Sequence, residues 1–290
     1  MSADVCQMRE SRDDRGEKRG FLRQLREFAS QLEDKVAAGG EWNVRGFIDR
    51  YRQVYGISDD TKVISKVLEL QLFPYFQIFA EEHGYILELS DKQNYYPDMT
   101  FIDARDETIK FAVDLKSTYR DEKHPDFCKG FTLGSFGKYF IDRTSRKNIM
   151  YPYGEYAAHI IFGIIYSRSA FSAQEATRPY RVEDVERIPA VAREFLFLVE
   201  EKWKLASDKK GSGNTANIGS IKYIPDLLQG NGVFSRCGED IFDDYWMNYG
   251  RMIVRKNHKA VKLSSLPDYL KKMKQPLSLY SAPRQQGKER

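Results

Sequence analysis

The sequence is poor in the residues that build zinc sites and disulfide frameworks. It has only three cysteines, Cys6, Cys128 and Cys237, and four histidines in 290 residues. The cysteines are scattered, odd in number and form no CxxC pair, so neither a zinc site nor a disulfide scaffold is indicated. We expect free thiols in a reducing cytoplasm.

Long apolar runs are absent as well. No stretch of about 18 apolar residues occurs, so no membrane-spanning helix is expected. The first residues combine acidic and basic side chains without an apolar stretch, and no secretory signal is visible. These absences predict a cytoplasmic protein that does not associate with membranes.

The net charge is small, +4, but it is unevenly distributed. Residues 251–290 carry eleven Lys or Arg and two acidic residues, a net of +9, which leaves −5 on the other 250 residues. A basic end on a slightly acidic body favours contacts with phosphates. A solvated, partly disordered tail would carry the same charges, so charge alone does not decide the function.

Two helices are expected in the first part of the chain. Residues 1–20 alternate in charge without an apolar period, which predicts disorder. The next segment places five apolar residues on one helix face before Gly39-Gly40 ends the helix: Phe21, Leu25, Phe28, Leu32 and Val36. We interpret this helix as a packing or dimerisation element. A second helix is predicted after the capping residues Ser58-Asp59-Asp60, with a bend or restart at Pro74.

Strand patterns begin after Gly84. Three short runs, Tyr85–Leu89, Met99–Asp103 and Ile109–Lys116, are joined by polar, turn-prone segments and predict an antiparallel meander. Tyr156–Tyr166 predicts a buried helix leading into a strand, and Phe195–Leu205 predicts another strand. The fold class is therefore α/β or α+β, with a central mixed β-sheet flanked by helices.

A group of charged residues lies on two of these strands. Asp114 and Lys116 are two positions apart, so both project from the same face of their strand, at what we expect to be the rim of the sheet. Asp98 opens the preceding strand, and a hairpin would bring it beside Asp114. Two adjacent carboxylates repel each other unless a cation joins them, and Mg²⁺ prefers carboxylate oxygens, water and phosphate.

Such a site is suited to phosphodiester hydrolysis. A bound Mg²⁺ lowers the pKa of a coordinated water, and Lys116 would orient the attacking water and stabilise the added negative charge. A surface ion pair would explain an isolated DxK triplet equally well, so this pattern needs support from the rest of the chain.

That support is a resemblance along about two thirds of the sequence. From about Ser58 to Arg255 the chain resembles the EcoRV-type type II restriction endonucleases, part of the PD-(D/E)xK nuclease superfamily. The resemblance rests on collinear short segments: Asp60-Thr61-Lys62-Val63, His83-Gly84-Tyr85-Ile86, Gln93-Asn94, Tyr96-Pro97-Asp98, Asp114-Leu115-Lys116, Phe131-Thr132-Leu133-Gly134, Lys147-Asn148-Ile149, Tyr151-Pro152, Gly211-Ser212-Gly213-Asn214-Thr215, Asn217-Ile218-Gly219-Ser220-Ile221 and Asp244-Tyr245-Trp246.

The resemblance implies a restriction-endonuclease-like fold and a homodimer that cuts both strands of a palindromic DNA duplex with Mg²⁺. It implies metal ligation by Asp98, Asp114, the backbone carbonyl of Leu115 and the auxiliary acid Glu69, with catalytic roles for Lys116 and Lys62. The implied DNA contacts are Gly211, Ser212, Gly213, Asn214 and Thr215 in the major groove, Gln93 and Asn94 in the minor groove, and Thr118, Thr132 and Lys147. A cognate DNA methyltransferase is the expected genetic companion.

Together with the charge pattern, the resemblance divides the chain into four expected regions. They are a disordered extension (1–20), an N-terminal helix and dimerisation region (21–57), a nuclease and DNA-binding domain (58–255) and a basic tail (256–290).

The match departs from the enzyme after which the family is named in a longer connection from Asp121 to Lys129, in extended termini and at three single residues. Tyr95 replaces a His, Lys92 replaces a Gln and Ala216 replaces a Thr. Because the loop that reads bases is otherwise intact, the expected target is GATATC, cut to blunt ends. Glycines allow close approach of the backbone to base edges, and Asn214 can pair with adenine.

Two other functions fit the same catalytic residues. One is a repair or junction-resolving nuclease that selects DNA by structure, although such an enzyme has no use for a loop that reads the major groove. The other is a catalytically inactive DNA-binding protein, which the presence of both aspartates and the lysine disfavours.

Overall fold

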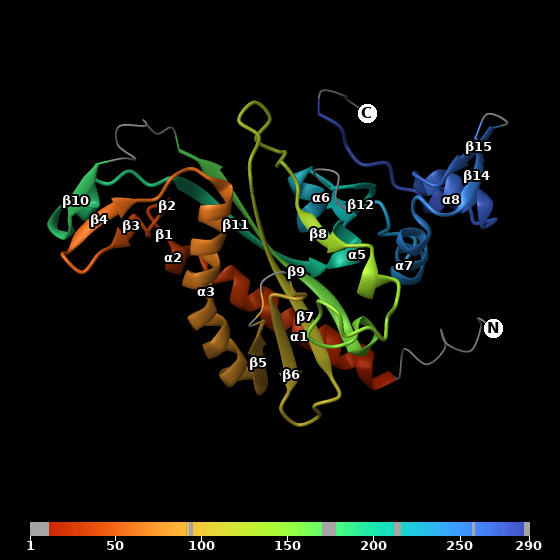
Figure 1. Ribbon diagram of the computed structural model, residues 1–290, viewed down its shortest axis with the longest axis horizontal. Coiled ribbons are helices and arrows are strands. Elements are labelled where there is room, and N and C mark those ends of the chain that lie inside the picture. Colours follow the sequence, from red (N-terminus) through yellow and green to blue (C-terminus); the bar gives the residue numbers. More distant parts are fainter. Residues whose placement is uncertain are drawn as a thin grey trace.

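The computed structural model describes residues 12–90, 92, 95–169, 178–211, 216–256 and 259–286, with side chains from residue 16 onward. A seven-stranded mixed sheet lies at its centre (Figure 1). Strands β7 and β9 run parallel, and the other neighbouring strands of the sheet are antiparallel. In spatial order the strands are β1 (Ala37–Ala38), β2 (Glu41–Trp42), β11 (Ala192–Glu201), β9 (Tyr156–Arg168), β7 (Lys110–Tyr119), β6 (Met99–Asp103) and β5 (Tyr85–Leu89).

The two faces of this sheet pack into different hydrophobic cores. Because side chains alternate along a strand, Ile160, Phe162 and Ile164 of β9 enter the core beneath the N-terminal helices. Ile161 and Ile165 enter the second core, which is shared with the C-terminal half of the chain. Burial on both faces explains why β9 consists almost entirely of apolar residues.

Helix α1 (Arg12–Ser30) packs on the first face, followed by α2 (Glu33–Val36). The predicted apolar stripe is confirmed, since four of its five residues are buried and Phe28 is partly buried in the same core. The single helix expected to run up to Gly39-Gly40 is wrong, because α1 ends at Ser30, α2 is a separate short helix, and β1 lies between α2 and the glycines. Phe21 stacks on Phe111 of β7 with ring centroids 4.2 Å apart. Residues 12–20 belong to this helix, so the expected disorder is wrong for them, and residues 1–11 of that expected segment lie outside the described residues.

Helix α3 (Thr61–His83) packs beside α1 in the same core. The predicted cap is confirmed, because the side chain of Asp60 accepts hydrogen bonds from the backbone N–H groups of Lys62 and Val63. Gly84 ends the helix in the left-handed conformation. Pro74 lies inside the helix without ending it.

The second face is covered by the C-terminal half. A three-stranded sheet of β12 (Ala206–Lys210), β13 (Asn217–Ser220) and β8 (Thr132–Ser135) packs there with several short helices. These helices are α5 (Lys202–Leu205), α6 (Ile224–Leu228), α7 (Glu239–Asn248) and α8 (Leu266–Lys272). The remaining short elements are the 3₁₀ turns η1 (Lys138–Phe140), η2 (Tyr153–Glu155), η3 (Val182–Arg187) and η4 (Leu277–Leu279).

Two small sheets lie at opposite ends of the molecule (Figure 1). One consists of β10 (Pro179–Arg181), β4 (Gln53–Gly56) and β3 (Gly46–Ile48). The other is the hairpin of β14 (Ile253–Lys256) and β15 (Lys259–Lys262) in the basic C-terminal part of the chain. The expected tail (256–290) therefore starts at the last residue of β14, and its described part contains β15 and helix α8.

The predicted meander is confirmed: β5 and β6 have the expected bounds, β7 extends to Tyr119, and the three strands are antiparallel neighbours. The expectation of a helix within Tyr156–Tyr166 is wrong, because this segment lies inside β9 and pairs with both β7 and β11. A long apolar run does not separate a buried helix from a buried strand by its periodicity. The strand expected at Phe195–Leu205 ends at Glu201, where α5 begins.

None of the described helices is both long enough and apolar enough to cross a membrane. Among the described residues Cys128 and Cys237 are free thiols, as expected, and Cys6 lies outside them.

Candidate active site

The hairpin of β6 and β7 brings the two predicted aspartates together. Its register pairs Met99 with Val113, so Asp98 and Asp114 are the next opposed positions. The backbone N–H of Leu115 donates a hydrogen bond of 2.8 Å to Oδ2 of Asp98. The prediction that a hairpin brings Asp98 beside Asp114 is therefore confirmed.

Lys116 contacts both carboxylates. Its Nζ lies 2.9 Å from Oδ2 of Asp114 and 3.4 Å from Oδ2 of Asp98. The shared face predicted for Asp114 and Lys116 is confirmed. The expected position at the rim is wrong for Asp114, which is 3% exposed and lies within β7, where the strand continues along β9. β6 begins directly after Asp98, and β5 ends at Leu89, which pairs with Met99, so both outer strands stop at the level of the site.

The electrostatics of the site reflect two carboxylates held close together. Burial, and then the negative charge of Asp114, raise the pKa of Asp98 to about 7. Burial alone would lower the pKa of Lys116, but Asp114 and Asp98 outweigh it and raise that pKa. A single ammonium thus neutralises only part of the charge, and the pair favours a further cation or a proton.

The donor set fits a hard divalent cation that keeps several waters. Among the described residues no group of three or more His, Cys, Asp or Glu side chains could hold a metal ion. Mg²⁺ does not need such a group, because one or two carboxylates with water and substrate phosphate satisfy it. Asp98 and Asp114 supply two carboxylates. Leu115, between Asp114 and Lys116 in the chain, lines a cavity that lies beside this site.

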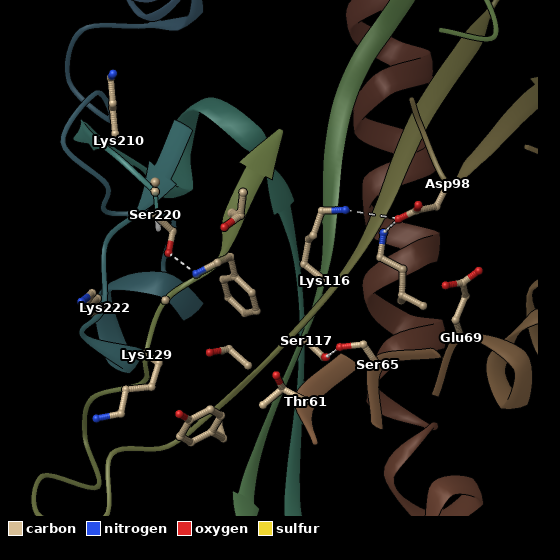
Figure 2. A pocket seen from close by; sticks show the side chains of 18 residues that line it. Thr61, Ser65, Glu69, Asp98, Lys116, Ser117, Lys129, Lys210, Ser220 and Lys222 are labelled. Carbon is tan, nitrogen blue, oxygen red and sulfur yellow. Dashed lines mark hydrogen bonds and ion pairs between the residues drawn. The ribbon is translucent and has the colours of Figure 1, made fainter. Parts of the chain in front are cut away.

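This cavity, with a volume of about 700 Å³, lies beside Asp98 and Lys116 (Figure 2). It brings together seven of the residues expected from the sequence: Glu69, Asp98, Leu115, Lys116, Thr118, Thr132 and Gly211. Figure 2 shows Glu69 on α3, on the same side of the cavity as Asp98. Its Oε1 is 2.6 Å from Nζ of Lys66.

Three of the expected site residues that the structure describes do not line the cavity. Asp114 is buried in β7 and contacts the cavity residue Lys116 through their ion pair. Lys62 is exposed at the start of α3, and Lys147 is exposed in the loop before β9. The other residues expected to contact DNA, Gln93, Asn94, Ser212, Gly213, Asn214 and Thr215, lie outside the described residues. The ends of the predicted reading loop are described: the N–H of Gly211 donates to the carbonyl of Asn217 at 2.9 Å, which closes the β12–β13 hairpin beside the cavity.

The comparison with known proteins gives two agreeing findings. A profile of the family described as Restriction endonuclease EcoRV matches residues 38–274. The chain is also 36% identical over 231 residues to the type II restriction enzyme EcoRV of Escherichia coli, which covers 79% of this chain and 91% of that enzyme. The chain belongs to the EcoRV restriction endonuclease family. It is a type II restriction endonuclease, and the α+β architecture with its helix-flanked mixed sheet is the restriction-endonuclease-like fold.

The endonuclease has a basic wall that the sequence did not reveal. Lys129, Lys210 and Lys222 line the cavity opposite Asp98 and Glu69 (Figure 2). They follow no common spacing, because they come from the segments around β8, β12 and β13, which the three-stranded sheet of these strands brings together. The uneven distribution of charge along the sequence did not indicate this wall either, because all three lysines precede the basic tail.

Two hydroxyl side chains of the cavity were also missed. Oγ of Ser65 on α3 lies 2.6 Å from Oγ of Ser117 on β7. This hydrogen bond joins the helix that carries Glu69 to the strand that carries Asp114 and Lys116. Serine is common in both helices and strands, so no pattern in the sequence indicated this contact.

Proposed function

We propose that this restriction endonuclease uses Mg²⁺ to cleave both strands of a short DNA palindrome, GATATC, leaving blunt ends. The observation that carries the metal dependence is the placement of Asp98 and Asp114 at opposed strand positions, both in contact with Lys116. The target and the ends are those that the resemblance to the EcoRV type implies. The departures at Lys92, Tyr95 and Ala216 concern flanking contacts in this proposal.

In the proposed site the carboxylates of Asp98 and Asp114 hold the metal, together with the carbonyl of Leu115 and with Glu69 as an auxiliary acid. Bound Mg²⁺ would supply charge neutralisation at the scissile phosphate and an acidified water. Lys116, fixed by two carboxylates, presents its ammonium where it orients the attacking water and stabilises the pentacoordinate phosphate. Lys62, at the start of α3, would assist from outside the cavity described above.

DNA recognition is assigned to segments that begin beside this site. Gly211 lines the cavity, so the segment of Ser212, Gly213, Asn214 and Thr215 that follows it starts within reach of a duplex bound there. In this proposal that loop reads the major groove and Gln93 and Asn94 enter the minor groove. Thr118, Thr132 and Lys147 would contact the sugar-phosphate backbone.

A homodimer completes the proposal, because a two-fold protein matches a palindrome. The sheet of β3, β4 and β10 supports it, since this region exposes large apolar side chains: Phe47 by 49%, Ile48 by 62% and Tyr55 by 46%. Light scattering at several protein concentrations tests the dimer. Changing Phe47 and Ile48 to Ser should give monomers.

The proposal includes a cytoplasmic location and a companion DNA methyltransferase that protects the same sequence. Both follow from the role of a restriction enzyme, which meets incoming DNA beside the host chromosome. Resistance of the host DNA to the purified enzyme would support the methyltransferase.

Digestion of a plasmid of known sequence tests the cleavage itself. We expect discrete fragments with blunt ends at GATATC in the presence of Mg²⁺ and none with a chelator. Cleavage only at branched DNA would contradict sequence selection. Asn214→Ala tests the reading loop: cognate cleavage should collapse while nonspecific DNA binding survives, and a parallel loss of both would mean that the loop is structural.

A further inference from the structure

Lys202 is a buried lysine whose charge has no hydrogen-bonded partner. It begins the short helix α5, and 1% of its surface is exposed. Its Nζ has no hydrogen-bond partner among the residues that the structure describes. The two preceding carboxylates pair elsewhere, Glu200 with Arg26 and Glu201 with Lys204, and the negative charges that act on Lys202 are those of Asp114 and Asp243. Burying an ammonium without a hydrogen-bonded partner costs free energy, so the filling of space does not by itself explain a lysine at this position.

Three aromatic rings enclose this ammonium. Nζ lies 5.0 Å from the ring centroid of Tyr96, 5.5 Å from that of Phe140 and 5.4 Å from that of Tyr153. Ring faces attract a cation, and they do so most strongly where water is absent. Burial lowers the pKa of Lys202 to about 8, so the ammonium remains the main form at neutral pH.

Tyr96 connects this aromatic box to the active site. It precedes Asp98 by two residues. Its ring stacks on Tyr139 with centroids 5.4 Å apart, and its hydroxyl lies 2.8 Å from Nδ1 of His159 on β9. Its backbone N–H donates to the carbonyl of Asn148 at 3.2 Å. Tyr96, two residues before Asp98, is thus held by contacts to its ring, its hydroxyl and its backbone. One of these contacts is that of its ring face with the ammonium of Lys202.

We propose that Lys202 is a positioning residue of the metal site, whose enclosed ammonium holds the ring of Tyr96 and thereby fixes Asp98 opposite Asp114. The proposal rests on the proposed Mg²⁺-dependent function. Lys202 does not reach the cavity and touches neither substrate nor metal. An apolar side chain of similar length would fill the same volume and keep the packing, but it would lose the attraction to the ring.

The test compares Lys202→Met with Lys204→Met in the full-length protein. Lys204 lies on the same helix and forms ion pairs, but it is outside the box. Mg²⁺ binding to the DNA-free protein is measured by calorimetry, and the Mg²⁺ dependence of cleavage by single-turnover kinetics. For Lys202→Met we expect Mg²⁺ affinity to fall about tenfold and the half-maximal Mg²⁺ concentration to rise equally. The rate at saturating Mg²⁺ should recover to within about threefold of wild type. Lys204→Met should match wild type.

A second pair of variants shows whether Lys202 acts through Tyr96. Tyr96→Leu removes the ring and should shift the Mg²⁺ dependence as Lys202→Met does, whereas Tyr96→Phe keeps the ring and should shift it little. The double variant Lys202→Met/Tyr96→Leu should be no worse than either single one, because both remove the same contact. If Lys202→Met does not fold, the Leu and Phe variants decide the question alone.

The outcomes separate the two proposals. If wild type cleaves without Mg²⁺, the proposed function fails. If wild type requires Mg²⁺ and Lys202→Met lowers only the melting temperature, Lys202 is a packing residue and the positioning role is overturned. Equal Mg²⁺ dependence of Tyr96→Leu and wild type would overturn it as well.

Discussion

The backbone N–H of Leu115 donates a hydrogen bond to Oδ2 of Asp98, at 2.8 Å, across the end of the β6–β7 pairing. This contact fixes one aspartate to the strand that carries the other, so the geometry of the site is set by main-chain register. Among the described residues, Lys116, with 25% of its side chain exposed, is the cation that forms ion pairs with both carboxylates. The site is thus arranged to receive a cation, and several consequences can be measured.

Asp114→Asn should abolish Mg²⁺-dependent cleavage. The amide keeps the shape of the buried side chain but removes a negative ligand and the stronger partner of Lys116, so we expect a loss of at least about a hundredfold in rate. Digestion of a cognate duplex at saturating Mg²⁺ measures it, with thermal melting to show that the fold survives. Asp34→Asn, at an exposed position on α2, is the matched control. Cleavage by Asp114→Asn at the wild-type rate would remove Asp114 from the proposed site.

The Mg²⁺ requirement should depend on pH. Because the pKa of Asp98 is raised to about 7, a proton competes with the metal below that pH. We expect the half-maximal Mg²⁺ concentration to fall about tenfold per pH unit up to about pH 7 and to level off above it. Mg²⁺ titrations of cleavage across this range measure the effect, and a flat profile would contradict it.

The metal-free protein should show the opposite dependence in its stability. The pKa of Asp98 in the folded state lies above its ordinary value of 3.8, so the folded state binds the proton more tightly than the unfolded state. This contribution is complete at low pH and is lost as pH rises through about 7. Comparing urea unfolding of wild type and Asp98→Asn with a chelator present isolates it, because the asparagine variant should lack this slope.

The basic wall should contribute to DNA binding through phosphates. Changing Lys210 and Lys222 together to Ala should weaken cognate and noncognate binding alike and lower the slope of log K against log salt by about two, since each phosphate contact contributes about one. Binding is measured without Mg²⁺ to prevent cleavage. Arg23→Ala, on the helix that covers the other face of the sheet, should leave the slope unchanged. A loss confined to cognate DNA would instead indicate base contacts.

Helix α1 should be essential to stability. Phe21 is fully buried against Phe111, Tyr85 and Phe101, so Phe21→Ala leaves a cavity and should cost about 3–5 kcal/mol in the free energy of unfolding. Urea denaturation at a fixed protomer concentration measures it. Arg23→Ala on the exposed face should change stability by less than about 0.5 kcal/mol. Equal stability of the two variants would mean that α1 does not pack on the sheet in solution.

The local patterns were sufficient where neighbouring residues decide the structure. The period of apolar residues located α1 and α3, and the turn-prone segments located the β5–β6–β7 meander. Alternation along β7 placed Asp114 and Lys116 on one face, because successive strand side chains point to opposite sides. The predictions were wrong where contacts with other segments determine the secondary structure. Tyr156–Tyr166 is a strand because β7 and β11 pair with it on both sides, and residues 12–20 are helical in continuation of the packed stripe.

By itself, the sequence determined the family of this protein and the core of its candidate site. Asp98, Asp114 and Lys116 lie within one hairpin, whose short-range register the chain encodes locally. Only the tertiary structure decided which other groups join them. Lys129, Lys210 and Lys222 reach one wall, and Lys202 reaches its aromatic box, through contacts between segments far apart in the chain. Such contacts depend on how whole sheets pack, and no spacing along the sequence records them.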